Sequence, residues 1–472
     1  MDARSIQYVA AACGGELLKG SPDALALRVS TDSRQVGPGD LFFALAGERF
    51  DGHDFLAEAA RKGAAAVVVQ SGRAPAGLRG SALIQVDNPR RALGRLAEQY
   101  RKEFELRMVA VGGSNGKTTT KEILASVLRQ KLSTLWSEAS FNNDIGVPLT
   151  LLKLDATHQA AVLEAGTNHP GELEPLVRMI QPRYGVLTSI GREHLEFFGT
   201  LEGVAQEEGW LAELLPAGGK LFINGDSEWT TGIINRSRAR VFRIGFAESN
   251  EWRVRSVRTD KQGISFRIDA PLSEFAGDYK LPLVGRHQAI NALLAIAVAA
   301  EFGLSRAEIE RGLAECRAPK MRLQVWEFSG VRVLDDAYNA NADSAIAALE
   351  TLKDMPCKGR RVAVLGDMAE LGQHTEAAHE EVGRRVAEFG VGQLFAVGKM
   401  APVIARGARQ AGMNRVLEFS NIEAAAAAVK SFVKNGDLLL LKASRASRLE
   451  RISELLRGGE SAKKNHLSAL AI

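Results

Sequence analysis

A glycine-rich segment gives the clearest prediction of chemistry, Gly112-Gly113-Ser114-Asn115-Gly116-Lys117-Thr118-Thr119. An apolar run at 108–111 precedes it and predicts a strand, and residues 119–130 predict a helix. A glycine-rich turn between a strand and a helix binds phosphate through backbone N–H groups and the positive end of the helix. Lys117 is then expected to reach the β- and γ-phosphates of ATP, and the Thr118 hydroxyl is expected to bind Mg²⁺.

The loop departs from the usual G-x-x-x-x-G-K-[ST] pattern, because Val111 stands where the first glycine is expected. The preceding strand, the Gly116-Lys117-Thr118 segment and the following helix still favour a nucleotide site over a solvated glycine-rich turn. Such a loop does not identify a reaction, since kinases, switches, motors and ligases all contain one. Other residues must therefore decide the function.

Two further side chains are candidate metal ligands near this loop. Glu164 follows an apolar run at 160–163, and His194 lies in the segment 191–196, after a second apolar run at 185–188. A carboxylate at the carboxyl end of a parallel strand, beside a phosphate loop, is well placed to bind Mg²⁺. The alternatives are a capping or surface role for the glutamate and a structural role for the histidine.

The elements that must position these residues alternate between strands and helices. The length of 472 residues predicts about three domains, which we place at 1–102, 103–319 and 320–472. The first is expected to be mixed α/β and the second a phosphate-loop domain with a mainly parallel sheet. The third is expected to be Rossmann-like and doubly wound. The predicted fold class is therefore α/β.

Several elements can be placed from the hydrophobic pattern. Residues 241–268 alternate between polar and apolar types, which predicts antiparallel strands, and residues 285–300 predict a long helix. An amphipathic helix that ends near residue 102 follows the turn at Asp87-Asn88-Pro89 and could connect the first two domains. The remaining predicted strands are 64–69, 83–86, 331–334, 361–365, 394–397 and 438–441.

Composition limits the classes of function. The chain has 60 Lys+Arg against 56 Asp+Glu, a net charge of +4, which argues against a nucleic-acid binder. Its three cysteines, Cys13, Cys316 and Cys357, are scattered, so neither a disulfide framework nor a zinc site is expected. No apolar run approaches the roughly 20 residues of a spanning helix, and no secretion signal is recognised. We expect a soluble, cytoplasmic protein without membrane insertion.

Taken together, these motifs resemble the Mur ligases, which are ATP-dependent amide-forming enzymes of peptidoglycan precursor synthesis. Beside the phosphate loop, the segments that carry the resemblance are Asn142-Asn143, 146–150, 164–166 and 191–196. The segments that resemble the MurF type within this family are 335–341 (D-D-A-Y-N-A-N), 366–372 (G-D-M-A-E-L-G) and 441–445 (L-K-A-S-R). The resemblance covers nearly the whole chain, in the same order.

The resemblance implies a reaction. The chain would join D-alanyl-D-alanine to UDP-N-acetylmuramoyl-tripeptide, with ATP and Mg²⁺ as cofactors and an acyl phosphate as the intermediate. It would have no nucleic-acid partner, and we expect a monomer. The alternatives are another Mur ligase or folylpolyglutamate synthase and, from other classes, a nucleotide-hydrolysing switch or motor or a catalytically silent nucleotide-binding scaffold.

The resemblance also implies roles for individual residues. Those implied to bind ATP are Gly113, Ser114, Asn115, Gly116, Lys117, Thr118, Thr119, Asn291, Arg322, Asp336, Tyr338 and Asn339. Those implied to bind the other substrates are Ser33, Arg34, Gly47 (in the segment 47–53), Asn142, Asn143, Asn341, Lys442, Ser444 and Arg445. The implied metal ligands are Thr118, Glu164 and His194. The implied catalytic residues are Lys117, Glu164, His194 and Glu208.

Glu208 marks a departure from the family pattern. In most Mur ligases a lysine stands at this place, and CO₂ converts it to a carbamate that supports a metal ion. Here the segment reads Gln206-Glu207-Glu208-Gly209. A glutamate keeps the charge of a carbamate but reaches about 3–4 Å less far. We hypothesise that Glu208 supports the metal ion in place of the carbamate, without CO₂ and through a metal-bound water. The alternative is that Glu208 lies on a solvated helix face.

Overall fold

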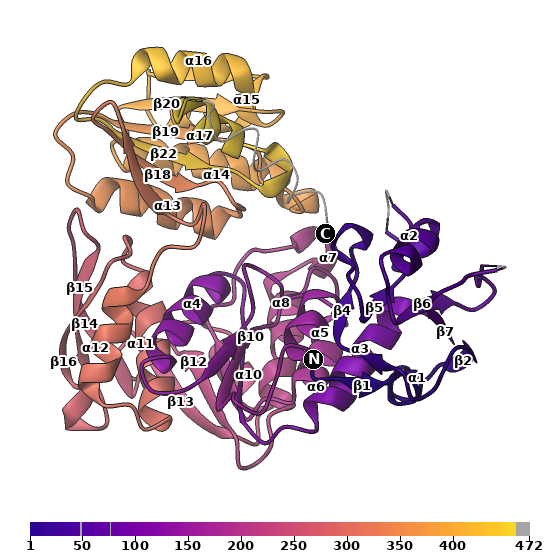
Figure 1. The fold of residues 1–472 in the computed structure, drawn as a ribbon. Coiled ribbons are helices and arrows are strands. Elements are labelled where there is room, and N and C mark those ends of the chain that lie inside the picture. The colour runs from indigo at the N-terminus through magenta and orange to yellow at the C-terminus, as the bar shows by residue number, and fades with distance from the viewer. Residues whose placement is uncertain (48–49, 76, 459–472) are drawn as a thin grey trace.

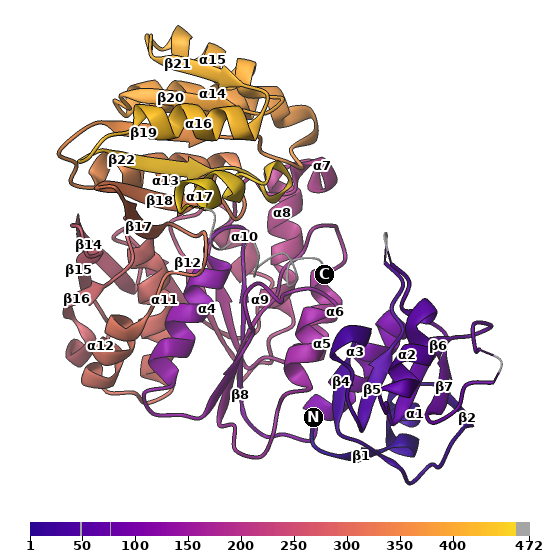
Figure 2. The ribbon, with the colours of Figure 1, turned by 45° about the horizontal axis from the view of Figure 1, so that its top comes forward.

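Four β-sheets form the framework of residues 1–47, 50–75 and 77–458, which are the parts of the chain that the computed structural model describes. They are arranged in three lobes, with the amino-terminal lobe beside the central one and the carboxyl-terminal lobe on top (Figure 1; Figure 2). The predicted α/β class is confirmed. Glu48 and Arg49, within the segment expected to bind substrate, lie outside the described residues.

The amino-terminal lobe contains β1 (Arg4–Ser5), α1 (Ile6–Cys13), β2 (Glu16–Lys19), β3 (Leu25–Ala26), β4 (Arg28–Ser30), β5 (Asp40–Phe43), α2 (Leu56–Arg61), β6 (Ala66–Gln70), β7 (Ala82–Val86) and α3 (Pro89–Arg101). Its main sheet has the order β2-β7-β6-β5-β4 and is parallel except for β2, while β1 pairs with β3. The strands expected at 64–69 and 83–86 are β6 and β7, so the mixed α/β prediction is confirmed.

Helix α3 joins the first two lobes, as the sequence predicts. It begins after Asn88, whose side-chain oxygen accepts hydrogen bonds from the N–H groups of Arg90 (2.9 Å) and Arg91 (3.1 Å), the usual role of an N-cap asparagine. Its apolar side, which includes Leu93 and Leu96, belongs to a hydrophobic core that both lobes share. The helix therefore fixes the amino-terminal lobe against the central one.

The central lobe contains β8 (Arg107–Gly112), α4 (Lys117–Leu128), β9 (Thr134–Trp136), α5 (Gly146–Leu151), β10 (Ala160–Glu164), α6 (Leu173–Ile180), β11 (Tyr184–Leu187), α7 (Leu195–Phe198), α8 (Leu201–Glu208), α9 (Trp210–Glu213), β12 (Lys220–Asn224), α10 (Thr230–Ile234), β13 (Arg240–Gly245), β14 (Trp252–Thr259), β15 (Ile264–Asp269), β16 (Gly277–Leu281), α11 (Gln288–Glu301) and α12 (Arg306–Glu315). Its sheet has the order β16-β15-β14-β13-β12-β11-β8-β10-β9. Strands β8 to β14 run parallel, and β15 and β16 pair antiparallel.

The sheet is covered on both faces, which explains why its strands are continuously apolar. In β8, Met108 and Ala110 face one core while Val109 and Val111 face the other. The second of these cores also takes in the apolar side of α11. Both faces of β8 are thereby packed, which fixes the strand from which the phosphate loop starts.

The prediction of antiparallel strands over 241–268 is wrong in part. Strands β14 and β15 are antiparallel, but β13 runs parallel to β12 and to β14. Alternation reports that one face of a strand is less buried and does not report the direction of its neighbours. The helix expected at 285–300 is α11, and it begins later because the chain turns at Gly285, whose φ is +106°.

The carboxyl-terminal lobe contains β17 (Gln324–Phe328), β18 (Val331–Asp336), α13 (Ala342–Asp354), β19 (Arg361–Leu365), α14 (Thr375–Glu388), β20 (Gln393–Val397), α15 (Ala401–Gln410), β21 (Val416–Phe419), α16 (Ile422–Phe432), β22 (Leu438–Lys442) and α17 (Glu450–Leu456). Its sheet has the order β17-β18-β22-β19-β20-β21 and is parallel except for β17. The four predicted strands are present, and the edge strands β17 and β21 were not predicted.

The main sheets of the three lobes belong to separate stretches of the chain. Residues 102 and 319, where the domain limits are predicted, lie between α3 and β8 and between α12 and β17; the limits themselves stay a prediction. In the described parts of the chain, no helix combines the length and apolarity that crossing a membrane requires.

Strand β8 is the topological switch point of the central sheet. It lies between β10 and β11: the chain runs from β8 to β9 and β10 on one side of it and then crosses to β11 on the other side. The carboxyl ends of parallel strands at such a point border a crevice that binds ligands. The phosphate loop, Glu164 and the segment 189–194 all lie at the carboxyl ends of these three strands and converge there.

Candidate active site

A cleft of 1350 Å³ lies where the three lobes meet. The central lobe contributes the carboxyl ends of its parallel strands, the carboxyl-terminal lobe contributes residues that follow β18 and β22, and the amino-terminal lobe contributes one side of α3. Sequence-predicted residues that line this cleft are Ser114, Asn115, Gly116, Lys117, Thr118, Thr119, Asn142, Asn143, Glu164, His194, Asn291, Arg322, Asp336, Tyr338, Asn339, Asn341, Lys442, Ser444 and Arg445.

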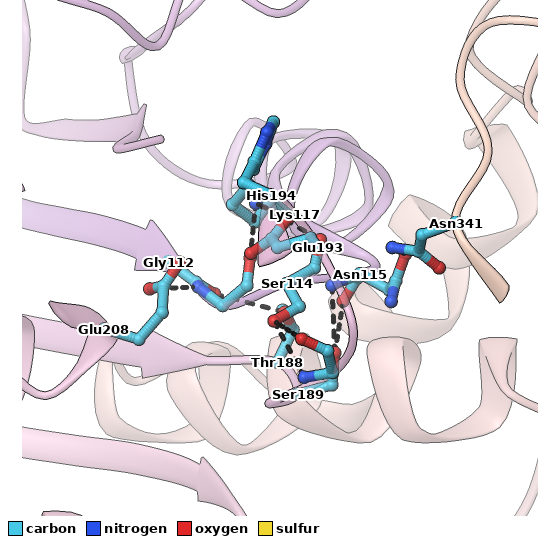
Figure 3. Close-up of polar contacts among 12 residues, drawn as sticks. Gly112, Ser114, Asn115, Lys117, Thr188, Ser189, Glu193, His194, Glu208 and Asn341 are labelled. Carbon is cyan, nitrogen blue, oxygen red and sulfur yellow. Dashed lines mark hydrogen bonds and ion pairs between the residues drawn. The ribbon is translucent and has the colours of Figure 1, made fainter. Parts of the chain in front are cut away.

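The phosphate loop is held from behind by the segment that follows β11 (Figure 3). The N–H groups of Ser114 and Asn115 donate to the carbonyl (2.8 Å) and the hydroxyl (2.9 Å) of Ser189. Helix α4 begins directly at Lys117, earlier than predicted, after Gly116 with a φ of +92°. The loop is thus preformed, with the helix N-terminus opening onto the cleft.

Gly113 has no room for a side chain. Its φ is +107°, and a Cβ there would lie 2.5 Å from Oγ1 of Thr188. Gly113→Ala should therefore weaken nucleotide binding and lower the free energy of unfolding by about 2–3 kcal/mol. Gly412→Ala is the matched control: its φ is +90° but nothing lies within 4 Å of the added Cβ, so about 1 kcal/mol is expected. Equal effects in denaturant unfolding would contradict the close packing of the loop.

Lys117 lies at the floor of the cleft and is largely buried, with 12% of its side chain exposed. Its Nζ donates to the carbonyls of Gly113 (2.5 Å) and Ser114 (3.2 Å) and lies 3.3 Å from Oε2 of Glu193. Burial by itself lowers the pKa of Lys117, but the carboxylates of Glu193, Glu208 and Glu164 more than offset this and raise it. The side chain therefore remains an ammonium, the form that can neutralise phosphate charge.

Among the buried oxygen atoms beside the loop that have no partner in the described chain, those of Glu164 and Thr118 match the predicted metal ligands. Glu164, at the end of β10, accepts a hydrogen bond from Nδ2 of Asn142 (2.8 Å) through Oε1. Its Oε2 and the Oγ1 of Thr118 are buried, and no described residue donates to or accepts from them. Carboxylate and hydroxyl oxygens are the ligands that Mg²⁺ prefers. Within the described chain, however, no three His, Cys, Asp or Glu side chains are grouped as a metal site, so the remaining ligands would come from the nucleotide and water.

His194 points away from the phosphate loop in this structure (Figure 3). Its Nδ1 pairs with Oε2 of Glu370 in the carboxyl-terminal lobe, and this contact lowers the pKa of Glu370. The neighbouring Arg192 forms ion pairs with Asp343 and Glu381, both at 2.6 Å. The segment 191–194 therefore links the central lobe to the carboxyl-terminal lobe.

The predicted asparagines have different surroundings. Asn291, in α11, donates to Oε1 of Gln288 (2.8 Å), and its amide lies beside Gly116 of the phosphate loop. Its contact with ATP stays a prediction. Asn143 instead accepts hydrogen bonds from the N–H groups of Gly146 (2.8 Å) and Ile145 (3.2 Å). Its side chain therefore closes the turn that leads into α5.

In the carboxyl-terminal lobe, the predicted residues form one connected group. Asp336 and Lys442 lie opposite each other at the ends of β18 and β22, and their side chains pair at 2.6 Å. Lys442 also donates to the carbonyl of Asn339 (2.8 Å). The guanidinium of Arg322 lies 4.3 Å from the ring centroid of Tyr338, and that of Arg445 lies 5.9 Å from it.

Asn341 connects this lobe to the phosphate loop. Its side-chain oxygen accepts from the N–H of Ser344 (2.8 Å) and so caps α13, while its Nδ2 donates to Oδ1 of Asn115 (3.1 Å). Arg322 makes a second link, to the hydroxyl of Ser140 (3.2 Å). Ser444 is buried beside Ser447, at 3.3 Å between the hydroxyls.

Three predicted residues of the amino-terminal lobe, Ser33, Arg34 and Gly47, do not line the cleft. Ser33 is buried, and Arg34 pairs with Asp32 at 2.8 Å. The structure therefore does not bring this group together with the phosphate loop. That these residues bind a substrate stays a prediction.

Glu208 lies behind the phosphate loop, not on the cleft surface (Figure 3). It ends α8, is fully buried, and its Oε2 accepts a hydrogen bond from the N–H of Gly113 at 2.6 Å. Burial raises the pKa of Glu208 to about 8, although Lys117 and the Gly113 N–H act in the opposite direction. The alternative of a solvated helix face is wrong.

Two residues with evident contacts were not predicted. Glu193 holds Lys117, and Glu370 holds His194. Both stand inside segments that the sequence singled out, 191–196 and 366–372. The position of Glu193 directly before His194 was a signal for its role. Glu370 and His194 stand 176 positions apart, and no local pattern reveals such a pairing.

The geometry of the cleft by itself defines a class of protein. A phosphate loop at a switch point faces a second, doubly wound domain across a shared cleft, which is the arrangement of a nucleotide-dependent enzyme with several substrates. Three family models match the chain: "Mur ligase family, catalytic domain" over residues 28–101, "Mur ligase middle domain" over 111–299, and "Mur ligase, glutamate ligase domain" over 321–445.

Relatives and solved structures agree with these matches. The UDP-N-acetylmuramoyl-tripeptide–D-alanyl-D-alanine ligase of Bacillus subtilis (strain 168) is 34% identical over 90% of this chain and 92% of its own length. A crystal structure of MurF from Acinetobacter baumannii matches with a TM-score of 0.88 and 29% identity, covering 97% of this chain and 99% of that one. MurF from Thermotoga maritima in complex with ADP matches with a TM-score of 0.80 and 28% identity over 91% and 96%. The chain belongs to the Mur ligase family, and within it to the MurF type.

Proposed function

We propose that this chain is an ATP-dependent ligase that joins D-alanyl-D-alanine to UDP-N-acetylmuramoyl-tripeptide. The observation that carries the proposal is the cleft, in which the phosphate loop faces Asn341 and Tyr338 of the carboxyl-terminal lobe. The name of the Bacillus subtilis relative states this reaction for that protein, and the Thermotoga maritima structure contains ADP.

The residues of the cleft suit the chemistry of amide formation. Lys117 and the N–H groups of the loop would hold the triphosphate and offset the negative charge that develops during transfer of the γ-phosphate to the tripeptide carboxylate. The dipeptide amine then attacks the acyl phosphate, and phosphate leaves. The carboxyl-terminal lobe excludes water from this intermediate by covering the cleft. Tyr338, with Arg322 and Arg445 beside its ring, is placed to contact the nucleotide or the dipeptide carboxylate.

Thr118 and Glu164 are the residues that would hold Mg²⁺, because each presents a buried oxygen without a partner in the described chain. Bound there, the ion supplies charge neutralisation on the transferring phosphate. His194 would be a further ligand only after its ring leaves Glu370.

The phosphate-release assay tests this proposal. Wild-type enzyme with ATP, Mg²⁺, UDP-N-acetylmuramoyl-tripeptide and D-alanyl-D-alanine should release phosphate and form one amide product per phosphate. Omitting any one of these components should abolish the product. Phosphate release that is equally fast without the dipeptide would contradict ligation, and product formation with a free amino acid in place of the dipeptide would favour another Mur ligase.

We also propose that Glu208 is a positioning residue that does the work of the family's carbamylated lysine without CO₂. Its contact with the Gly113 N–H supports this, since the carboxyl acts on the phosphate loop itself. Direct metal binding has less support, because Glu208 does not line the cleft.

The three cysteines support an intracellular, reducing location. Cys13, Cys316 and Cys357 are free thiols, and the first two are buried. A chain that works in an oxidising compartment would more often pair such residues. We propose that the enzyme is cytoplasmic and acts as a monomer, since its cleft is completed by lobes of one chain.

A further inference from the structure

The segment between β11 and α7 presents one carboxylate to the phosphate loop. Glu193 is 8% exposed and lines the cleft. Its Oε2 lies 3.3 Å from Nζ of Lys117, while its Oε1 is buried and no residue in the described ranges donates to it. A buried carboxylate oxygen without a donor is costly, so a role in the site would explain why it is kept there.

The residues on either side of Glu193 point the other way. Arg192 reaches Asp343 and Glu381, and His194 pairs with Glu370. The chain is also fixed by its backbone, since the N–H of Glu196 donates to the carbonyl of Glu370 at 3.0 Å. The place of Glu193 is therefore set by contacts with the carboxyl-terminal lobe on both sides.

We propose that Glu193 is a positioning residue: it keeps the Lys117 ammonium at its nucleotide-binding position while the cleft contains no nucleotide, and the ammonium binds the triphosphate instead when ATP enters. The carboxyl-terminal lobe fixes the position of Glu193 through Arg192. The proposal rests on the nucleotide site described above but not on the identity of the amine substrate.

The negative charge of Glu193 should affect nucleotide affinity and the rate of turnover in opposite directions. With the triphosphate bound, Glu193 is a negative charge close to further negative charges, so it weakens nucleotide binding. It also fixes the position of Lys117, and a preorganised cation stabilises the transition state better than a mobile one. Removing the charge of Glu193 should therefore tighten nucleotide binding and slow turnover.

Glu193→Gln tests this directly. The affinity for a non-hydrolysable ATP analogue, measured by calorimetry, should increase about fivefold, while kcat for ligation falls about tenfold and KM for ATP falls with it. The matched control is Glu202→Gln, an exposed glutamate in α8, which should leave both constants unchanged. General damage to the site would raise KM as kcat falls. Analogue affinity that is unchanged or weaker in Glu193→Gln would overturn the proposal.

The contribution of the carboxyl-terminal lobe has its own test. Arg192→Ala removes the ion pairs with Asp343 and Glu381 and should shift kcat in the same direction as Glu193→Gln, by about threefold. If Arg192 acts through Glu193, the double variant should be no slower than Glu193→Gln. If the fold losses in kcat of the two single variants multiply in the double variant, Arg192 does not act through Glu193. A wild-type enzyme that fails to bind the analogue would instead contradict the proposed function.

Discussion

Lys117→Met should reduce the rate of ligation about 100- to 1000-fold while the chain stays folded. The ammonium is the cation that the phosphate loop itself supplies, and three carboxylates keep it charged despite burial. Methionine keeps most of the length and volume of the side chain but neutralises no phosphate charge. A loss of this size is typical for removal of one preorganised charge or donor from a transition state.

The control for this variant is Lys131→Met. Lys131 follows the end of the same helix, is exposed, and donates to the carbonyl of Gly303 at 2.6 Å, outside the cleft. It should retain wild-type activity in the phosphate-release assay, and circular dichroism should show both variants folded. Lys117→Met with more than a tenth of wild-type activity would contradict the placement of the triphosphate on this loop.

Local patterns predicted the parts of the site that are close together in the sequence. The phosphate loop was visible because glycines, a lysine and a threonine follow an apolar run, and Glu164 was visible because it ends the next parallel strand. Parallel strands that are buried on both faces read as short apolar runs. The seven strands predicted in this way lie within a few residues of β8, β10, β11, β18, β19, β20 and β22, whereas β9, β12 and β16 of the central sheet were not predicted.

What the sequence could not predict depends on contacts between distant residues. The pairing of His194 with Glu370 joins two lobes, and the direction of β13 depends on its neighbours in the sheet. Likewise, the residue types at Asn143 and Lys442 did not reveal their partners within the chain, which are the N–H groups of a turn before α5 for Asn143 and the carboxylate of Asp336 for Lys442. A residue type indicates which partners are possible, and only the fold decides which partner is near.

Glu208 gives the second large prediction. Glu208→Ala should lower kcat about 10- to 100-fold, the usual cost of removing a group that orients a ligand-binding residue. The buried N–H of Gly113 would lose its acceptor and the loop its support. Full activity of the alanine variant would refute a role for Glu208.

Glu208→Gln separates the hydrogen bond from the charge. Its amide oxygen can accept from the same N–H of Gly113, so the variant keeps the hydrogen bond and removes only the ability of residue 208 to carry a negative charge. We therefore expect Glu208→Gln to retain most of the activity that the alanine variant loses. A loss as large as that of Glu208→Ala would show that the negative charge is required, and would favour action through a metal-bound water.

Glu208→Lys tests whether the carboxyl replaces a carbamate. Without CO₂, the variant buries a second ammonium near Lys117, so activity should fall at least as far as in Glu208→Ala. Bicarbonate should restore part of it, since carbamylation converts the new ammonium into a carboxylate-like group, whereas wild-type activity should be the same with and without bicarbonate. A wild-type enzyme that needs bicarbonate would contradict the proposal, because it would locate the required carbamate on some lysine other than residue 208.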